Sequence, residues 1–248
     1  TSYYSNSALA GDMANPAQGD VLALLAPYKA DLLPGAIEGY ALPVSDGKPT
    51  NRANLRKANA LLEAAGWTVQ DGVLQDAKGN PFSFEILLSN GADDYIAAAN
   101  IYIQALAQVG IQAKLTTVDA AQYTERTNLY DFDMTQQLIA LSLSPGTEQL
   151  RYWDAANGQA PGSRNWAGVN SAAVDGLVQT MLSSTDRADF VTAVQALDRV
   201  LTTGRYFVPM WYQNIGRIAN AKQLHFPEKL PIYGDWPGFQ PEVWWYQE

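Results

Sequence analysis

The sequence predicts an α/β fold, in which a largely parallel sheet is covered by helices. Between residues 82 and 141, three apolar runs typical of strands alternate with two segments in which apolar residues recur every three or four positions. A strand that leads through a helix to the next strand is the usual connection between parallel neighbours. The predicted centre of the fold is therefore a β-α-β-α-β core sheet with flanking helices.

Turn residues and glycines bound the predicted core elements. The turn Lys-Gly-Asn-Pro at 78–81 precedes the first strand, and Gly110 closes the first helix, in which Ile96 and Ile103 share a face. The core elements are a strand at 82–88, a helix at 93–109, a strand at 111–118, a helix at 120–128 and a strand at 131–141.

Further elements flank this core. A helix at 52–65 places Leu55, Ala58 and Leu62 on one face, and Gly66 suits its C-terminal cap. Apolar residues spaced three or four positions apart recur in two later segments, and an apolar run follows the second of them. These patterns predict helices at 172–183 and 187–202 and a strand at 206–212.

The chain is expected to divide into three consecutive segments. Residues 1–50 hold five prolines and are predicted to be an irregular crossing or strap segment with one short helix at 18–25. Residues 51–220 form the α/β lobe. Residues 221–248, rich in proline and aromatic side chains, are expected to be an extended tail that packs on the lobe or on another part of the protein.

Composition excludes several function classes. The net charge of −9 argues against nucleic acids and anionic membranes as partners, since both attract Lys/Arg patches. No segment approaches the roughly 20 apolar residues that span a bilayer. The chain has no cysteine and one histidine, His225, and it lacks GxSxG, HExxH and P-loop motifs. We therefore predict no cofactor, no metal site and no enzyme activity.

The most informative segment is 131–168, where a strand runs into a polar loop rich in Gly, Asn, Ser and Pro. Loops at the carboxyl ends of parallel strands are the usual place for a ligand. The segment contains DFDM, SPGTEQ and PGSRN, and other characteristic segments are SYYSNSALA, NRANLRKANALLEAAGW and VQALDRVLTTGRYFVPMW. Taken together, in their fixed order along most of the chain, these segments resemble the carboxyl-terminal part of the family 5 solute-binding proteins of ABC importers, in particular the YejA-like oligopeptide-binding branch.

This resemblance implies a type II periplasmic binding protein-like lobe, roughly the second half of a two-lobed protein. The N-terminal lobe and a signal peptide are expected to lie outside this chain. The tail at 221–248 is expected to pack either on the α/β lobe or on that N-terminal lobe. The implied function is capture of oligopeptides or peptide-containing compounds in an interlobe cleft in the periplasm, and delivery to an ABC permease in the inner membrane. An isolated lobe is expected to bind weakly or not at all.

The first candidate site residues lie around the end of the last core strand. Gln136, Gln137, Ser142 and Ser144 are expected to present polar groups to an extended peptide, although they also suit an ordinary strand with polar exposed positions. Many peptide-binding family members have an aspartate just after this strand that holds the ligand's free amine, and here Ser142 stands nearest that place. Either Glu148 or the missing lobe supplies the charge, or the ligand is not held by a free amine.

The loop supplies further candidates. Arg164 is placed to grip a carboxylate and Asn165 to pair with a peptide amide, with the alternative that Arg164 locks the loop against a carboxylate. Trp153 and Trp166 flank the loop and are expected to contact ligand.

Two other functions remain open. A binding protein for oligosaccharides or other non-peptide solutes would stack Trp153 and Trp166 on sugar rings. A hydrolase would use Asp131 and Asp133, which share a strand face, but acidic residues at a strand start are usually solvated or paired, for example with Arg126.

Overall fold

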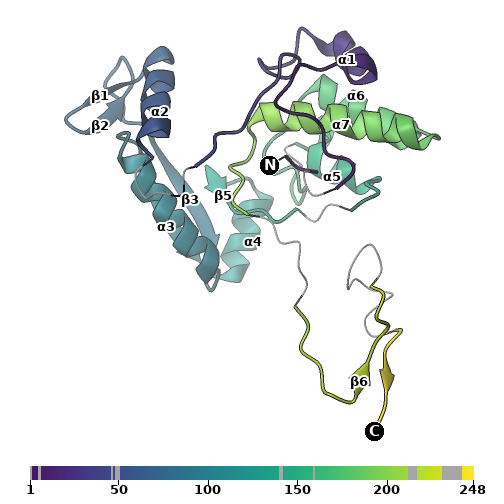
Figure 1. Cartoon of the computed structure of the whole chain (residues 1–248). Helices are drawn as coiled ribbons and strands as arrows, with labels where there is room; N and C mark the ends of the chain where they lie inside the picture. Colours follow the sequence, from purple (N-terminus) through teal and green to yellow (C-terminus); the bar gives the residue numbers. More distant parts are fainter. Residues whose placement is uncertain are drawn as a thin grey trace. The chain divides into compact units, whose positions relative to one another are not determined.

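The computed structural model describes residues 2–4, 7–45, 47, 51–139, 142–158, 160–211, 217–230 and 242–248. The chain forms two compact units that interleave along the sequence (Figure 1). We call them the sheet unit, which comprises Ala41–Ile139 and Ala155–Val169, and the helical unit, which comprises Thr1–Tyr40, Ala140–Asp154 and Asn170–Glu248.

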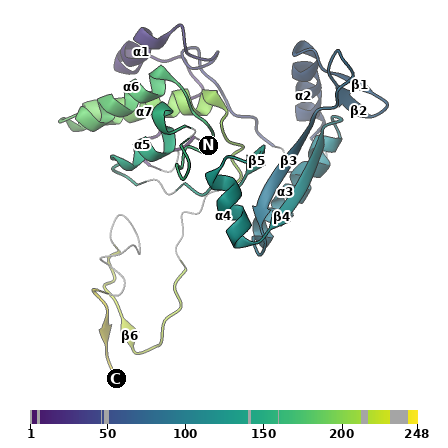
Figure 2. The ribbon, with the colours of Figure 1, turned by 180° about the vertical axis from the view of Figure 1, so that it is seen from behind.

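The sheet unit contains the predicted β-α-β-α-β core. Its three strands run parallel in the order β4-β3-β5, so β3 lies in the middle, and Figure 2 shows β4 beside β3. β3 pairs along its whole length with β4 but only through Ile86 and Leu87 with β5. The core elements are β3 (Ser83–Ser89), α3 (Asp93–Ala107), β4 (Gln112–Val118), α4 (Ala120–Asn128) and β5 (Met134–Thr135).

The two faces of β3 carry different side chains because successive residues of a strand point to opposite faces. Ile86 and Leu88 are buried with Ala99 of α3, and Tyr95, Ile96 and Ile103 pack on them. Glu85 and Leu87 belong to the opposite face. Arg126 of α4 reaches Glu85 there, which places α4 on that side. The sheet is therefore covered by one helix on each face, as expected for parallel strands.

A second core lies beside the sheet. Leu74, Val109 and Ile111 are buried together, and residues of α2 (Arg52–Ala64) such as Leu55 and Leu62 pack on them. The hairpin of β1 (Thr68–Gln70) and β2 (Val73–Gln75) contributes Leu74. Asn51 caps α2 by accepting a hydrogen bond from the amide of Asn54, at the helix start that the sequence predicts.

The helical unit is built on one long helix. α6 and α1 pack on α7, and the buried face of this packing includes Leu177 and Met181 of α6 and Val194, Leu197 and Leu201 of α7. Its elements are α1 (Gly19–Leu25), the 3-10 helix η1 (Ala26–Tyr28), α5 (Glu148–Trp153), α6 (Ala172–Ser183), α7 (Arg187–Gly204), β6 (Leu224–His225) and β7 (Trp245–Tyr246).

Two adjacent charged residues of α7 hold the segment 2–40, which we call the N-terminal strap. Asp198 and Arg199 are both buried. The Asp198 carboxylate accepts hydrogen bonds from the amides of Tyr3 (2.9 Å) and Gly11 (3.4 Å), and burial raises its pKa. The Arg199 guanidinium donates to four strap carbonyls, those of Asp12, Asn15, Ala36 and Ile37. The N-terminal strap thus packs on α7 through its backbone.

Two predicted strands are wrong in extent. The strand expected at 131–141 is reduced to the two residues of β5, and residues 136–139 are irregular, while 140 and 141 lie outside the described residues. The Thr135 hydroxyl donates to the Leu87 carbonyl, so at the strand end this carbonyl accepts a hydrogen bond from a side chain. The strand expected at 206–212 is absent over its described residues 206–211, where Pro209 has no amide hydrogen to donate.

The three consecutive segments expected from the sequence differ from the two interleaved units, and the boundaries 1–50, 51–220 and 221–248 stay a prediction. Within the parts of the chain that the structure describes, no helix is both long and apolar enough to cross a membrane.

Candidate functional site

The carboxyl end of β5 in the sheet unit carries buried polar atoms without partners. Gln136 and Gln137 follow β5 directly and are half-buried. The Oε1 atoms of both side chains are buried and, among the described residues, accept no hydrogen bond. Gln137 is held in place by its Nε2, which donates to the Arg164 carbonyl (3.0 Å). Because unpaired buried acceptors are costly, these two atoms are candidates for contact with a ligand.

Trp166 adds a buried donor to the same unit. Its indole Nε1 is buried and has no hydrogen-bond partner within the described ranges. Its ring meets Phe132 edge-on, with ring centroids 6.5 Å apart, and Phe132 stacks in turn on Tyr130 at 6.4 Å. We did not expect this aromatic row from the sequence, although Tyr130 and Phe132 show the two-residue spacing of one strand face.

The Asn165 side chain forms hydrogen bonds within its own loop. It is fully buried, its Nδ2 donates to the Val169 carbonyl (2.9 Å), and its Oδ1 accepts from the Val169 amide (2.8 Å). These bonds indicate that Asn165 fixes the loop around Trp166, in place of the ligand contact that we expected. Arg164 beside it has an exposed side chain.

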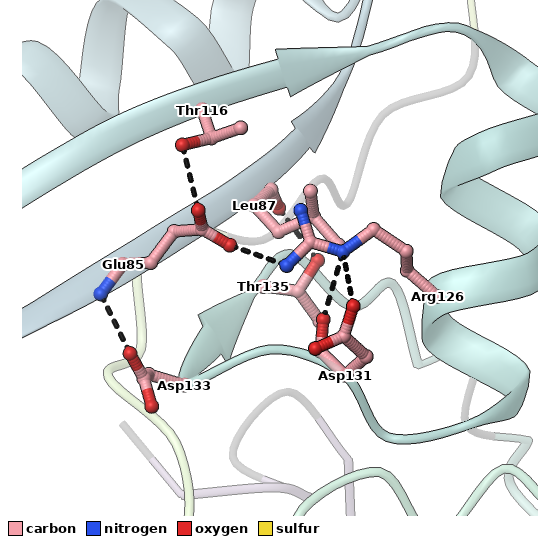
Figure 3. Close-up of polar contacts among 7 residues, drawn as sticks. All are labelled: Glu85, Leu87, Thr116, Arg126, Asp131, Asp133 and Thr135. Atoms are coloured by element: carbon pink, nitrogen blue, oxygen red, sulfur yellow. Dashed lines mark hydrogen bonds and ion pairs between the residues drawn. The ribbon is translucent and has the colours of Figure 1, made fainter.

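A polar network on the α4 side of the sheet holds β5 in place (Figure 3). The Asp133 carboxylate accepts from the Glu85 amide (2.8 Å), and Arg126 of α4 forms ion pairs with Glu85 (2.6 Å) and Asp131 (2.8 Å). Thr116 of β4 donates to the other Glu85 oxygen (2.8 Å). Since β5 shares only two residues with the ladder, these contacts position the strand that leads to Gln136.

The network also bears on the hydrolase alternative. Burial alone would raise the pKa of Glu85, but hydrogen bonds from Thr116 and Arg126, and the charge of Arg126, hold its pKa below its ordinary value. Glu85 is therefore an ionised acceptor that contributes to stability at neutral pH, and this contribution is lost as the pH falls through the lowered pKa. Asp131 and Asp133 are engaged in the same network, which favours the paired interpretation over a catalytic one.

We expect Arg126→Met to raise the pKa of Glu85, because a hydrogen bond and a charge that lower it are removed while the effect of burial remains. A titration of side-chain carboxyl resonances by nuclear magnetic resonance measures this change. Asp131→Asn is the matched control, since it removes only the exposed partner of Arg126 and leaves the Glu85 contact intact. An equal shift in both variants would contradict the assignment.

The other expected site residues, Ser142, Ser144, Glu148 and Trp153, belong to the helical unit. Ser142 and Ser144 are exposed, and the Ser142 hydroxyl accepts from the Ser144 amide (3.1 Å). Glu148 Oε1 accepts from the Gly146 amide (2.8 Å) and from the Gln149 side chain (3.3 Å), so it is engaged at the start of α5.

Trp153 occupies the interior of the helical unit. Only 1% of its surface is exposed, and its indole nitrogen donates to Gln149 Oε1 (2.8 Å), which also accepts from the Tyr4 hydroxyl (2.9 Å). Burial and the charge of Asp198 raise the pKa of Tyr4, so its hydroxyl keeps the proton that it donates. In this structure Trp153 is a buried core residue and offers no ring face to a ligand, in contrast to the ligand contact expected from the sequence.

Among the residues that the structure describes, no three His, Asp or Glu side chains are grouped so as to hold a metal ion.

Comparison with known proteins identifies the family. Residues 13–161 match the bacterial extracellular solute-binding proteins, family 5 Middle. The chain belongs to this family. The resemblance carried by the loop segments is thereby confirmed, and the family consists of binding proteins described as extracellular.

Two curated relatives from Agrobacterium fabrum (strain C58) align with nearly the whole chain. "Probable peptide-binding protein YejA" is 37% identical over 248 residues, which are 99% of this chain and 39% of the relative. "Peptidoglycan-binding protein YepA" is 36% identical over 248 residues, which are 98% of this chain and 39% of the relative. The chain therefore spans about two fifths of the length of these relatives.

Solved structures confirm the fold class. The oligopeptide-binding protein AppA from Bacillus subtilis, in complex with a nonapeptide, superimposes with a TM-score of 0.60 at 19% identity, over 97% of this chain and 47% of AppA. A mannohexaose-bound periplasmic oligopeptide-binding protein from Thermotoga maritima gives 0.58 at 19% identity, over 77% and 33% of the two chains. The predicted fold of type II periplasmic binding proteins is confirmed by this likeness.

Proposed function

We propose that this chain is part of the substrate-binding component of an ABC importer, which captures oligopeptides or peptide-containing compounds and delivers them to a permease in the inner membrane. The protein would act in the periplasm and leave its ligand chemically unchanged. Membership of the extracellular solute-binding family supports the proposal, as does the relative named for peptide binding. Lobes that close on a ligand about a hinge are the usual mechanism of such proteins.

The observation that carries the proposal concerns three buried atoms of the sheet unit that have no hydrogen-bond partner among the described residues, the Oε1 atoms of Gln136 and Gln137 and the Nε1 of Trp166. A peptide main chain offers amide donors and carbonyl acceptors at regular intervals. Peptide N–H groups would satisfy the two glutamine oxygens, and a peptide carbonyl would satisfy the indole. Such contacts bind a main chain without selecting its side chains.

A free amine on the ligand would need a carboxylate partner. The segment from Met134 to Leu150 contains a single carboxylate, Glu148, and its Oε1 already accepts two hydrogen bonds. The remaining Glu148 oxygen, or polypeptide outside this chain, would bind a free amine. A ligand bound only through its main chain would need neither.

A second candidate ligand contains sugar as well as peptide. The Thermotoga neighbour was solved with mannohexaose, and the relative YepA is named for peptidoglycan, a polymer of both. The ring of Trp166 suits a sugar face. The peptide part of such a compound would use the same glutamine oxygens, whereas a plain oligosaccharide would depend on the ring.

Binding measured on a hybrid in which this chain replaces the matched region of Agrobacterium fabrum YejA tests the proposal, with a tripeptide, a disaccharide-peptide fragment of peptidoglycan and a cello-oligosaccharide as ligands. We expect Trp166→Phe to weaken tripeptide binding about five- to tenfold, since it removes one hydrogen bond worth about 1 kcal/mol but keeps a ring. Trp245→Phe in the tail is the control and should leave affinity unchanged. Saturable cello-oligosaccharide binding that survives Trp166→Phe, with no peptide binding, would replace the proposal with the sugar alternative. Cleavage of the peptide, detected by mass spectrometry, would contradict a binding function.

A further inference from the structure

The hydroxyl of Tyr123 lies where the last core strand ends. Tyr123 is near the start of α4, and its hydroxyl oxygen is 2.9 Å from Thr135 Oγ1 and 3.4 Å from the Gln136 carbonyl oxygen. Thr135 is the last residue of β5, and Gln136 follows it directly. One side chain of the helix therefore contacts both the end of the strand and the first residue of the candidate site.

The distances indicate which hydroxyl is the donor. A hydroxyl group has one hydrogen to donate. The Thr135 hydroxyl donates to the Leu87 carbonyl at 2.7 Å (Figure 3), so Thr135 is the acceptor in its contact with Tyr123. Tyr123 is then the donor, and the Gln136 carbonyl is a second, more distant acceptor of the same hydrogen. Burial raises the pKa of Tyr123, so the hydroxyl keeps this hydrogen at neutral pH.

The start of α4 is a firm base for this side chain. The Asp119 carboxylate caps the helix by accepting from the amides of Ala121 (2.9 Å) and Gln122 (3.0 Å). The Asp119 carbonyl also accepts from the Tyr123 amide (2.8 Å). Side chains carried by rigid elements hold their partners more precisely than side chains on loops. Tyr123 can therefore hold the end of β5 in one position.

The two glutamines of the candidate site are held in different ways. The Gln137 side chain is anchored directly, because its Nε2 donates to the Arg164 carbonyl (3.0 Å). The Gln136 side chain has no such anchor among the described residues, and its buried Oε1 accepts no hydrogen bond there. Its direction therefore depends on the backbone at the end of β5, which is the backbone that Tyr123 contacts.

We propose that Tyr123 is a positioning residue of the ligand site, which sets the direction of the Gln136 side chain by holding Thr135 and the Gln136 carbonyl. Tyr123 acts through Gln136 and does not itself contact the ligand. The inference rests on the proposed function, in which the Gln136 oxygen accepts from a peptide amide. In the alternative, the Tyr123 hydroxyl only satisfies polar groups at the strand end and has no effect on the ligand.

Nuclear magnetic resonance of the 248-residue chain tests the positioning without a ligand. We expect Tyr123→Phe to shift the side-chain amide resonances of Gln136 more than those of Gln137, whose anchor is unchanged. Tyr102→Phe is the matched control. It keeps the ring of another half-buried tyrosine, in α3, whose hydroxyl forms no hydrogen bond within the described ranges, so the Gln136 resonances should not move. Gln136 resonances that are unchanged in Tyr123→Phe overturn the proposal.

Ligand binding separates positioning from a structural role. In the hybrid with Agrobacterium fabrum YejA, we expect Tyr123→Phe to weaken tripeptide binding about three- to tenfold, and Tyr102→Phe to leave it unchanged. In a Gln136→Met background the oxygen is already lost, so Tyr123→Phe should then change the affinity by less than about twofold, since residues that act through one contact are not additive. Losses of equal size in both backgrounds overturn the proposal in favour of a structural role.

The two measurements also distinguish this inference from the proposed function. If the unmodified hybrid melts cooperatively but binds no peptide, the proposed function fails. The Gln136 resonances of the 248-residue chain then decide by themselves whether Tyr123 sets the direction of this side chain. If the hybrid binds the tripeptide and Tyr123→Phe binds it equally well, the proposed function stands and the role of Tyr123 is overturned.

Discussion

Replacing Arg199 by methionine is expected to lower the free energy of unfolding of the helical unit by about 3 kcal/mol, since buried carbonyls lose their partners. Arg199 is 3% exposed, and its guanidinium donates to the carbonyls of Asn15 (2.9 Å), Ala36 (2.9 Å) and Ile37 (3.4 Å), and also to that of Asp12. Methionine fills much of the same space, so the loss reports hydrogen bonding more than packing. Thermal unfolding should show a midpoint lower by roughly 6–12 °C.

Two other variants separate the effect from a general loss of charge. Arg151→Met removes an exposed arginine of α5 and should change stability by less than about 0.5 kcal/mol. Arg199→Lys keeps the charge but lacks the planar fork that reaches several carbonyls at once, so an intermediate loss is expected. Equal midpoints for Arg199→Met and Arg151→Met would show that the strap is not held through this side chain.

Gly39→Ala is the second change that we expect to lower stability strongly. A methyl group has no room at Gly39, where the strap folds back against Ala14 and Asn15. A Cβ at Gly39 would lie 2.6 Å from the Ala14 carbonyl oxygen and 2.9 Å from the Asn15 carbonyl carbon, and φ is +104°. Both neighbours are backbone atoms, which cannot rotate away. We expect a loss of about 3 kcal/mol, of which the backbone conformation alone accounts for roughly 1 kcal/mol.

Gly66→Ala is the matched control for this change. Gly66 also has positive φ (+87°), but nothing lies within 4 Å of its added Cβ, so only the conformational cost of about 1 kcal/mol is expected. Hydrogen exchange of the Ala17 and Tyr40 amides reports the strap directly, since they donate to Ile37 and Met13 across the doubled segment. Unchanged exchange in Gly39→Ala would mean that the strap accommodates the methyl group.

The helices were the most predictable part of this chain. Their apolar spacing and their caps are local in sequence, and Asp119, Ser171 and Asp186 accept amide hydrogen bonds at three of the predicted starts. The helices over 120–128 and 172–183 coincide with α4 and α6. The parallel arrangement of the three core strands also followed from the alternation of strands and helices, because a helical crossover returns the chain to the same edge.

The ligand-binding roles of the candidate residues stay a prediction. The sequence pointed to the end of the last core strand, and Gln136, Gln137 and Trp166 have buried side-chain atoms without a hydrogen-bond partner among the described residues. It also suggested Trp153 and Asn165 as ligand contacts, and both are buried and hydrogen-bonded within the protein. Residue type alone does not distinguish a ligand contact from a core residue, because that depends on which groups from distant segments meet the side chain.

By itself, the sequence determined the α/β class, the order of the core elements and the family, because these depend on local periodicity and on segments read in order. The tertiary structure alone decided that β5 is two residues long, that Arg126 also pairs with Glu85 of β3, and that Asp198 and Arg199 hold the strap. Each of these joins residues far apart in the chain or depends on where a strand leaves its neighbour. Such contacts are fixed by the packing of the whole unit, and short-range sequence patterns carry no record of them.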